Sequence, residues 1–304
     1  MKTVCIYHSI DLDGWMSAAI VKYIFKEINN DSKELNKLEV DFIGYNYGQE
    51  IPNLENYDKI IMCDISFPLS EFQKLRQGLL KDIIWIDHHA SAIKESDEYA
   101  NNFGIKGIRD SKFSACELTW KFFFNNLPMP EIVRLLGRYD CFGHKGTDEE
   151  QKVLEFQYGA RSVISNYQTA YLALQESIRS NDKSVENIHS LGIAIYSFLC
   201  TDAKQSYKNG FEIFFRLENS PLYKFICINK ERFNPMNFGI DYHKEGYDGC
   251  ACFHYANGEW NFSLYNDNGN VDCSLIAKSF GGGGHKGASG FIVKDIGSII
   301  YNKI

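Results

Sequence analysis

The chain lacks long hydrophobic runs. No stretch of about 18 consecutive apolar residues occurs in its 304 positions, so the sequence offers no segment that would span a membrane. Its first residues carry a lysine and a short apolar run, but Asp11 follows at once, whereas a signal peptide needs a longer apolar region and a cleavage site of small residues. We therefore expect a cytoplasmic protein without a membrane partner.

An excess of basic residues is also absent. The formal net charge is −7, with 32 lysines and arginines against 39 acids. Proteins that bind duplex DNA usually have more basic than acidic residues, because basic side chains neutralise the backbone phosphates. Duplex DNA is therefore not an expected partner, while small anionic substrates remain compatible with this charge.

The cysteines show no disulfide pattern. There are nine, an odd number, and several lie inside apolar runs, as buried free thiols do in a reducing compartment. Cys250, Cys252 and His254 alternate along one predicted strand, but they lack the return pair of ligands that a structural zinc site needs. We therefore predict no zinc site there.

The composition, 44% hydrophobic and 23% charged residues, is that of an ordinary globular protein. The length of the chain predicts two domains. The N-terminal half alternates apolar, strand-like runs with stretches of helical period, which predicts βαβ units and a mostly parallel sheet. Ser114, with Glu117 three residues later, predicts a capped helix start. The strand candidates are residues 3–7, 38–44, 59–64 and 82–87, and the helix candidates are residues 15–28, 68–80, 114–126 and 130–139.

The second half of the chain shows a different pattern of apolar residues. Residues 148–217 show helical patterns without strand-like alternation, and 184–215 could form one long helix between two domains. The predicted fold class is α/β, with an N-terminal domain of mostly parallel sheet flanked by helices, joined by this helix to a smaller α/β domain. The predicted boundaries are 1–183, 184–218 for the helical linker, and 219–304, with strands at 225–228, 249–254 and 260–264 and a helix at 272–280.

Acids and histidines gather at the ends of predicted strands. Because the carboxyl ends of parallel strands meet at one edge of a sheet, these side chains should lie close together. Neighbouring carboxylates repel each other unless a cation lies between them, and carboxylates with imidazoles suit Mn²⁺, Mg²⁺ or a similar ion. The strand-end residues are His8, Asp11, Asp13, Asp64, Asp87, His88 and His89, and Asp140 ends a helix.

Each of these acids taken alone has a simpler explanation, since an acid after a strand is often a helix cap or a turn former. The combination of all of them favours a metal site instead. A carboxylate shared by two ions would give a two-metal site, with the ions roughly 3.5–4 Å apart, of the kind that supports in-line displacement at phosphorus.

A glycine run forms a second candidate site. Gly281 to Gly284 precede His285 and Lys286, and an apolar strand resumes at Phe291. A flexible linker or a helix C-cap would also use such glycines. A glycine-rich loop, however, exposes backbone N–H groups to an anion, and the two cationic side chains favour a phosphate-binding segment.

Taken together, the motifs resemble those of the DHH–DHHA1 phosphoesterases along essentially the whole chain. That superfamily includes RecJ-like nucleases, nano-RNases, cyclic-dinucleotide phosphodiesterases and, with another C-terminal domain, family II pyrophosphatases. Two residues separate His8 from Asp11, where many relatives have three, and this spacing resembles an oligonucleotide-cleaving branch. The motifs that carry the resemblance are His8-Ser-Ile-Asp11-Leu-Asp13-Gly14, Asp64, Asp87-His88-His89, Asp140 and Gly281-Gly-Gly-Gly-His285-Lys-Gly-Ala-Ser-Gly290.

The resemblance implies a role for each of these residues. Asp64 would bridge two Mn²⁺ ions, with Mg²⁺ or Co²⁺ as alternatives, and Asp87 would orient the histidines. His89 would contact the scissile phosphate or the leaving group, which makes His89 and Asp64 the catalytic pair. One ion would be held by His8, Asp11 and Asp64, the other by Asp13, Asp64, His88 and Asp140, and the substrate by Gly282, Gly283, Gly284 and His285.

The sequence thus predicts a metal-dependent phosphodiesterase. It would hydrolyse short single-stranded oligonucleotides or linear dinucleotides to mononucleotides by a two-metal mechanism. Aromatic residues make up 14% of the chain and offer platforms for stacking bases, without indicating which of them serve. Two alternatives remain open: a phosphomonoesterase or polyphosphatase acting on pAp-like or inorganic substrates, and a catalytically idle nucleotide sensor. A homodimer is compatible with the sequence.

Overall fold

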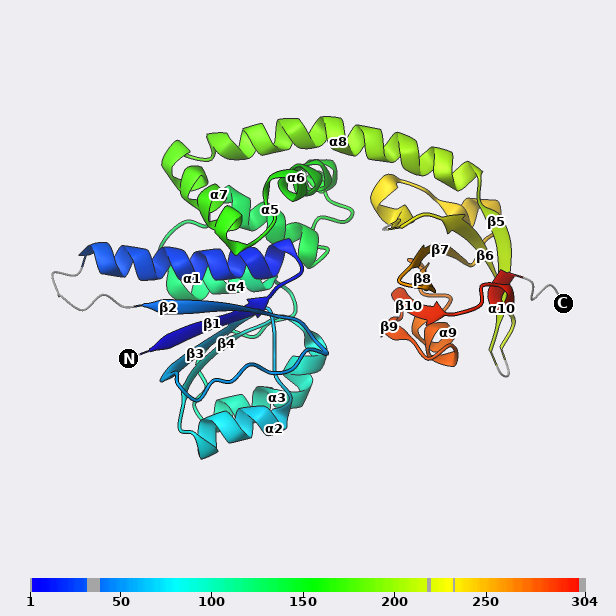
Figure 1. Ribbon diagram of the computed structural model, residues 1–304. Helices are drawn as coiled ribbons and strands as arrows, with labels where there is room; N and C mark the ends of the chain where they lie inside the picture. The colour runs from blue at the N-terminus through cyan, green and yellow to red at the C-terminus, as the bar shows by residue number, and fades with distance from the viewer. Residues whose placement is uncertain (1, 32–38, 218–219, 232, 301–304) are drawn as a thin grey trace. The chain divides into compact units, whose positions relative to one another are not determined.

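The computed structural model describes residues 2–31, 39–217, 220–231 and 233–300 (Figure 1). The chain divides into two compact units, Met1–Tyr196 and Ser197–Ile304, and the division falls inside the helix predicted as a linker. The predicted boundary between 218 and 219 lies outside the described residues, so the domain limits proposed from the sequence stay predictions. None of the helices in the described ranges has the length and apolar character needed to cross a membrane.

The first unit contains a four-stranded parallel sheet in the order β2-β1-β3-β4, as the sequence predicts. Tyr7 of β1 pairs with Cys63 of β3, and Cys63 pairs with Ile86 of β4. The residues that come next, among them His8 and Asp64, therefore lie level with one another at the carboxyl edge. The strands are β1 (Thr3–His8), β2 (Val40–Tyr45), β3 (Lys59–Cys63) and β4 (Asp82–Ile86).

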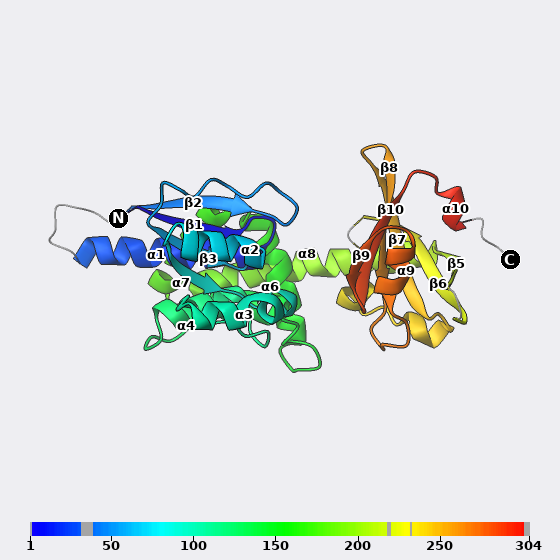
Figure 2. The same cartoon turned by 90° about the horizontal axis from the view of Figure 1, so that it is seen from below.

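Helices cover both faces of this sheet. In Figures 1 and 2, α1 and α4 lie on one face and α2 and α3 on the other. Strand residues pack alternately into the two layers, Ile61 against Ala18 of α1 and Met62 in the cluster that contains Phe72 of α2. The helices are α1 (Leu12–Asp31), α2 (Leu69–Gln73), α3 (Ala90–Asn102), α4 (Ala115–Phe123), α5 (Glu131–Asp140), α6 (Glu150–Val163) and α7 (Tyr167–Ser180).

Two helix predictions need correction in their bounds. The first helix begins at Leu12 rather than at Trp15, so Asp13 lies in its first turn instead of in the preceding loop. The helix expected over 68–80 is α2 followed by a wider, π-helical turn, Lys74–Gly78. The capped start at Ser114 is confirmed, because Ser114 and Glu117 form a capping box.

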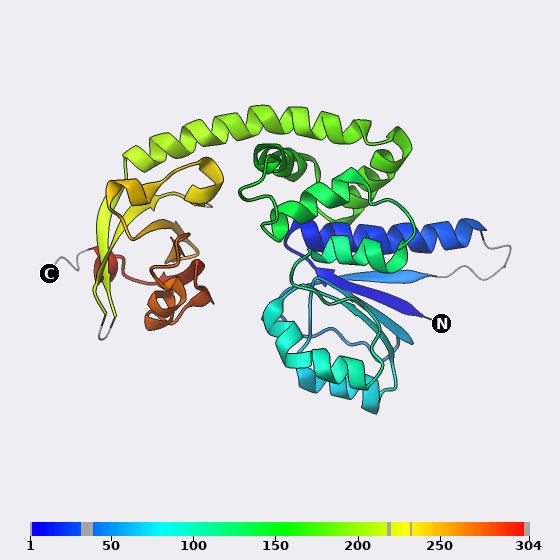
Figure 3. The ribbon, with the colours of Figure 1, turned by 180° about the vertical axis from the view of Figure 1, so that it is seen from behind.

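The second unit is built on a six-stranded mixed sheet in the order β5-β6-β7-β8-β10-β9 (Figure 3). Among the described strands of this second sheet, only β6 and β7 pair in parallel. One face packs on α9 through an aromatic core that includes Phe262 and Phe291. The strands are β5 (Phe211–Arg216), β6 (Leu222–Asn229), β7 (Gly249–Ala256), β8 (Glu259–Tyr265), β9 (Gly283–His285) and β10 (Ala288–Val293), and the helices are α9 (Cys273–Ser279), α10 (Gly297–Ile300) and two 3₁₀ turns, Pro235–Phe238 and Tyr242–Glu245.

The long helix is shorter than predicted. It is α8 (Lys183–Lys208), and residues 211–216 form β5 where the sequence suggested helix and no strand. Gly210 ends the helical pattern, and Phe211, Ile213 and Phe215 then alternate toward the core. Phe214 between them is also apolar, and it hid the alternation.

Candidate metal centre

Asp64 lies at the centre of the site. Its backbone N–H donates to the carbonyl oxygen of Ile86 at 3.0 Å, so the ends of β3 and β4 fix its position. Its φ of +61° is left-handed, which aspartate tolerates better than most residues but at a cost of roughly 1–3 kcal/mol. The residue is 1% exposed, and its Oδ1 makes no hydrogen bond of good geometry. A buried carboxylate oxygen in this condition is one that a cation would satisfy.

His8 and Asp11 approach Asp64 from one side. The Nδ1 of His8 lies 2.6 Å from Asp11 Oδ2 and 3.4 Å from Asp64 Oδ2. Asp11 Oδ1 accepts a hydrogen bond from the backbone N–H of Gly14 at 2.9 Å, so Asp11 also caps α1. A glycine is required at position 14, because a Cβ there would lie 2.1 Å from the carbonyl oxygen of His8. The helix therefore packs directly on the end of β1.

His88 joins Asp64 to the acids on the other side. Its Nε2 lies 3.2 Å from Asp64 Oδ1, 3.3 Å from Asp140 Oδ2 and 3.8 Å from Asp13 Oδ2. His88 follows β4 at the carboxyl edge of the sheet, whereas Asp140 is the last residue of α5. One imidazole nitrogen thus faces three carboxylates that come from different elements.

Asp13 is held by the start of α4. Its Oδ2 accepts the backbone N–H of Ala115 and its Oδ1 that of Cys116, each at 2.8 Å. These amides belong to the first turn of α4, where N–H groups have no partner within the helix. The positive end of the helix dipole favours the ionised carboxylate there. Asp13 is therefore fixed in position while each oxygen keeps further lone pairs.

The start of α4 is itself supported by α5. Glu117 accepts a hydrogen bond from the backbone N–H of Ser114 at 3.1 Å and another from Arg138 Nη2 at 2.9 Å. Gly137 allows this close packing, because a Cβ at that position would lie 2.5 Å from Glu117 Cγ. The helix that carries Asp140 is thereby tied to the helix end that holds Asp13.

The close spacing of charged groups shifts the pKa values of the carboxylates and histidines in this centre. Burial and the charge of Asp64 raise the pKa of Asp13 to about 7, and burial with the charges of Asp13 and Asp64 raises that of Asp140. Burial opposes ionisation of Asp64, but the imidazoles of His8 and His88 close to its oxygens lower its pKa to about 2. Burial likewise opposes protonation of both histidines, yet their carboxylate partners raise each pKa to about 10. The metal-free site therefore retains protons where a cation would otherwise balance the carboxylates.

His89 is oriented by Asp87, a fully buried carboxylate. Asp87 Oδ1 accepts the backbone N–H groups of His88 and His89 and the Nδ1–H of His89, the last at 2.7 Å, while Oδ2 accepts Trp85 Nε1–H at 3.2 Å. This arrangement fixes the imidazole and leaves its Nε2 for another partner. Burial lowers the pKa of His89, but the hydrogen bond and charge of Asp87 outweigh burial and raise it.

The donor set fits a divalent cation that prefers oxygen and nitrogen ligands. The part of the chain that the structure describes contains three groups of potential ligands, and within each group the ligand atoms lie within 4.8 Å of one another. The groups contain carboxylates and imidazoles and no thiolate. All seven residues predicted for this centre are thus brought together, while their roles as ligands stay predictions. The groups are His8, Asp11 and Asp64; Asp13, His88 and Asp140; and Asp64, His88 and His89.

Sequence reasoning missed Asn46 and Tyr47, which follow β2. Asn46 Oδ1 lies 3.2 Å from His8 Nε2, and the Tyr47 ring centroid lies 6.1 Å from that of His8 and 5.9 Å from that of His89. Because β2 pairs with β1 in parallel, the residues after Tyr45 fall at the same edge as His8. The strand order would have revealed them, but the sequence does not state which strand lies beside β1.

The glycine run has a different conformation from the predicted loop. Gly281 adopts a φ of +79°, and the backbone N–H of Gly282 donates to the carbonyl oxygen of Ala277 at 2.8 Å, so these two glycines cap α9. The amide of Gly282 is therefore already bonded within the second unit, and a role of Gly282 in substrate binding stays a prediction. Gly283 and Gly284 continue into β9, which Figure 2 shows beside β10.

His285 ends β9 and is exposed, as is Lys286 after it. A groove of about 470 Å³ lies in the second unit beside Gly281, Gly282 and Gly290, and His254, Asn261 and Ser263 add polar groups to it. The structure thus places an open, partly polar groove beside the predicted substrate-binding segment. It does not test whether Gly283, Gly284 or His285 binds substrate.

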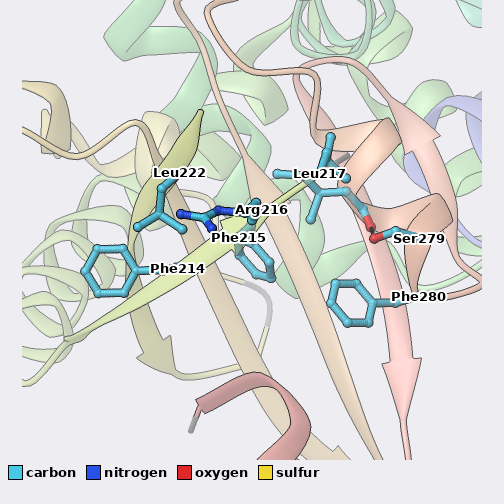
Figure 4. A pocket seen from close by; sticks show the side chains of 8 residues that line it. Phe214, Phe215, Arg216, Leu217, Leu222, Ser279 and Phe280 are labelled. Carbon is cyan, nitrogen blue, oxygen red and sulfur yellow. Dashed lines mark hydrogen bonds between the residues drawn. The ribbon is translucent and has the colours of Figure 1, made fainter. Parts of the chain in front are cut away.

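Another pocket of the second unit, about 190 Å³, lies between β5 and α9 (Figure 4). Its walls are largely aromatic and aliphatic, among them Phe214, Leu222 and Phe280, and Arg216 supplies a charged group. None of the predicted site residues lines it. We assign it no part in the chemistry.

Residues 3–136 match the DHH family, N-terminal domain. These residues therefore form a domain of the DHH type, and its clustered carboxylates and imidazoles indicate a metal-dependent phosphoesterase. The match ends before Asp140 and before the second unit. The assignment of that unit to the DHHA1 type thus stays a prediction.

Three similar proteins span nearly the whole chain. The uncharacterized protein R106 of Acanthamoeba polyphaga mimivirus is 25% identical over 311 residues, which covers 99% of this chain and 70% of that protein. A pGpG-specific phosphodiesterase from Vibrio cholerae has 12% identity and a TM-score of 0.54, covering 98% of this chain and 95% of the other. A DHH-domain structure described as a member of a family of ribosomal proteins has 16% identity and a TM-score of 0.51, covering 96% and 82%. The two structures establish the α/β fold.

Proposed function

We propose that this protein is a phosphodiesterase that cleaves short single-stranded oligonucleotides or linear dinucleotides to mononucleotides. The observation that carries the proposal is Asp64, whose carboxylate faces His8 and Asp11 on one side and His88 on the other. A single carboxylate between two groups of ligands is the arrangement that a two-metal phosphoesterase requires.

The two groups would hold Mn²⁺, with Mg²⁺ or Co²⁺ as alternatives that suit the same donors. When bound, such ions supply Lewis-acid stabilisation of phosphoryl oxygens and an activated water. The ligands we propose for one ion are His8, Asp11 and Asp64, and for the other Asp13, Asp64, His88 and Asp140.

The residues around these ligands would orient and protonate the substrate. Asp87 keeps the proton of His89 on Nδ1, so the ring presents Nε2 toward the substrate. The hydrogen bond and charge of Asp87 raise the pKa of His89, which favours a proton on Nε2 as well. That N–H would donate a hydrogen bond to a phosphate oxygen and a proton to the leaving oxygen. Exposed His285, with Gly283 and Gly284, would bind the rest of the substrate from the second unit.

The nucleotide class is supported by the fold likeness to a pGpG-specific phosphodiesterase, which extends over both units. It is supported further by the exposed aromatic Tyr47 beside His8 and His89, because bases stack on aromatic rings. A net charge of −7 argues against long duplex substrates.

The test is hydrolysis of labelled pGpG, other dinucleotides and trinucleotides with Mn²⁺, beside pAp, pyrophosphate and short polyphosphate. We expect mononucleotides from the dinucleotides, lost in Asp64→Asn and retained in Asp82→Asn, a matched change at an exposed acid that begins β4 at the opposite, amino-terminal edge of the sheet. Asparagine tolerates the left-handed backbone at position 64, so that variant keeps the fold. Phosphate release from pAp or polyphosphate alone would overturn the diesterase proposal in favour of a monoesterase or polyphosphatase.

A further inference from the structure

We propose that Phe142 is the surface on which a nucleobase of the substrate stacks. This inference rests on the proposed nucleotide substrate and adds the residue that recognises its base. Phe142 is 58% exposed, although burial of a phenylalanine ring is normally favourable. It follows Asp140 by two residues, so its Cα lies within roughly 7.6 Å of that of a proposed metal ligand.

The backbone at Phe142 is strained. Its φ is +55°, in the left-handed region, where a bulky side chain is a true outlier. Strain of this kind persists only where the surrounding structure imposes it, and it concentrates at functional sites. A glycine would adopt the same conformation freely, so the ring is kept at a conformational cost.

The turn that imposes this conformation is firmly held. His144 is buried and donates from Nδ1 to the carbonyl oxygen of Arg138 at 2.9 Å, and its ring stacks on that of Tyr139 at 5.5 Å with an interplanar angle of 7°. Thr147 Oγ1 donates to the carbonyl oxygen of His144 at 2.6 Å. The exposed ring of Phe142 is therefore presented from a rigid support, which reduces the entropy lost when a ligand stacks on it.

The chemistry around the ring fits a nucleotide. The ammonium nitrogen of Lys145 lies 4.6 Å from the ring centroid of Phe142. An aromatic face and a cation side by side match a planar base and a neighbouring phosphate.

The test compares Phe142→Gly and Phe142→Tyr with the wild-type protein. Glycine removes the ring but suits the left-handed backbone, so Phe142→Gly should fold, and tyrosine keeps a stacking face. Leu80→Gly is the matched control, because Leu80 is 76% exposed with a φ of +53° and precedes β4 at the opposite, amino-terminal edge of the sheet. Each variant is assayed by melting temperature, KM and kcat on pGpG, and on an analogue whose second nucleotide lacks a base.

We expect Phe142→Gly to raise KM for pGpG by roughly 5- to 100-fold, the range that loss of one base–aromatic contact gives, with little change in kcat. Phe142→Tyr and Leu80→Gly should keep the wild-type KM. On the abasic analogue, wild-type and Phe142→Gly proteins should have the same KM.

An unchanged KM of Phe142→Gly on pGpG, or an equal loss on the abasic analogue, would overturn the stacking role while leaving the phosphodiesterase intact. A wild-type protein that cleaves no nucleotide would instead reject the proposed function. A fall in melting temperature that Leu80→Gly does not share would assign Phe142 to the structure of the turn, which also overturns the proposal.

Discussion

At the scale of single residues, the metal centre is defined by carboxylates that lie close together around one imidazole. Asp13, Asp64 and Asp140 converge on His88, and each shifted pKa records how these groups share protons when no cation is present. Asp64 stays ionised with its pKa near 2, while both His8 and His88 hold protons with pKa values near 10.

Metal binding should therefore release protons. At pH 8 the metal-free His8 and His88 are both protonated, because their pKa values of about 10 lie above that pH, and a ring nitrogen must lose its proton to bind a cation. We expect release of at least two protons per protein molecule on saturation with Mn²⁺, and weaker binding as the pH falls. Calorimetric titration in buffers of different ionisation enthalpy measures this number.

The control for this titration is His8→Asn. Removing one of the two protonated imidazoles should reduce the release by about one proton, since His88 still loses its own. A binding enthalpy that is independent of the buffer at pH 8 would contradict the coupling.

At the scale of elements, two helix starts build the site. Asp11 caps α1, and the first amides of α4 hold Asp13. The Glu117–Arg138 pair ties α4 to α5, and Glu117 is 3% exposed. A buried carboxylate depends strongly on such a partner, because ionisation without one is costly.

Arg138→Met should accordingly lower the free energy of unfolding by about 2 kcal/mol, since it leaves Glu117 with one hydrogen bond fewer in a buried setting. Denaturant unfolding measures the change. The double variant Glu117→Gln, Arg138→Met should recover part of the loss, because a neutral amide tolerates burial better than a carboxylate. Equal stability of Arg138→Met and the double variant would contradict the idea that the unpaired charge of Glu117 causes the loss.

The contact between α1 and β1 gives a second test at this scale. Gly14→Ala would place a methyl group 2.1 Å from the carbonyl oxygen of His8, so we expect a loss of about 3 kcal/mol of unfolding free energy together with weaker Mn²⁺ binding. Gly78→Ala is the control, because no atom lies within 4 Å of a Cβ there. Wild-type stability of Gly14→Ala would show that α1 can shift without cost.

The sequence predicts the helices and strands well where the pattern that defines them is local. Apolar runs that end in acids revealed β1, β3 and β4, and their parallel pairing followed from the intervening helices. β5 was missed because Phe214 interrupts an otherwise alternating strand, and Asn46 and Tyr47 were missed because strand order is a long-range property. The use of Gly282 as a helix cap depends on where α9 ends, which the glycine run alone does not determine.

At the scale of the whole molecule, the chain has two units with separate cores, and all the proposed metal ligands belong to the first. The groups proposed to bind the substrate, Gly283, Gly284 and His285, belong to the second. Binding of metal and part of the binding of substrate should thus be separable by substitution.

We expect His285→Ala to leave the affinity for Mn²⁺ unchanged while raising KM for pGpG by roughly 10-fold, as loss of a hydrogen bond to a charged phosphate would. Calorimetry and steady-state kinetics measure the two quantities. Lys294→Ala, at an exposed lysine of the second unit, serves as the control. A change in Mn²⁺ affinity on replacing His285 would contradict the separation.

The convergence of Asp13, Asp64 and Asp140 also bears on how long the protein survives in a cell. A cation that binds the folded chain stabilises it, by about 2.7 kcal/mol at a hundred times the dissociation constant. The unfolded fraction then falls about 100-fold, and degradation that acts on unfolded chains slows in proportion. A low concentration of the metal would accordingly lower both the activity of the enzyme and its abundance. The amount of enzyme in the cell would then follow the supply of the ion on which its chemistry depends.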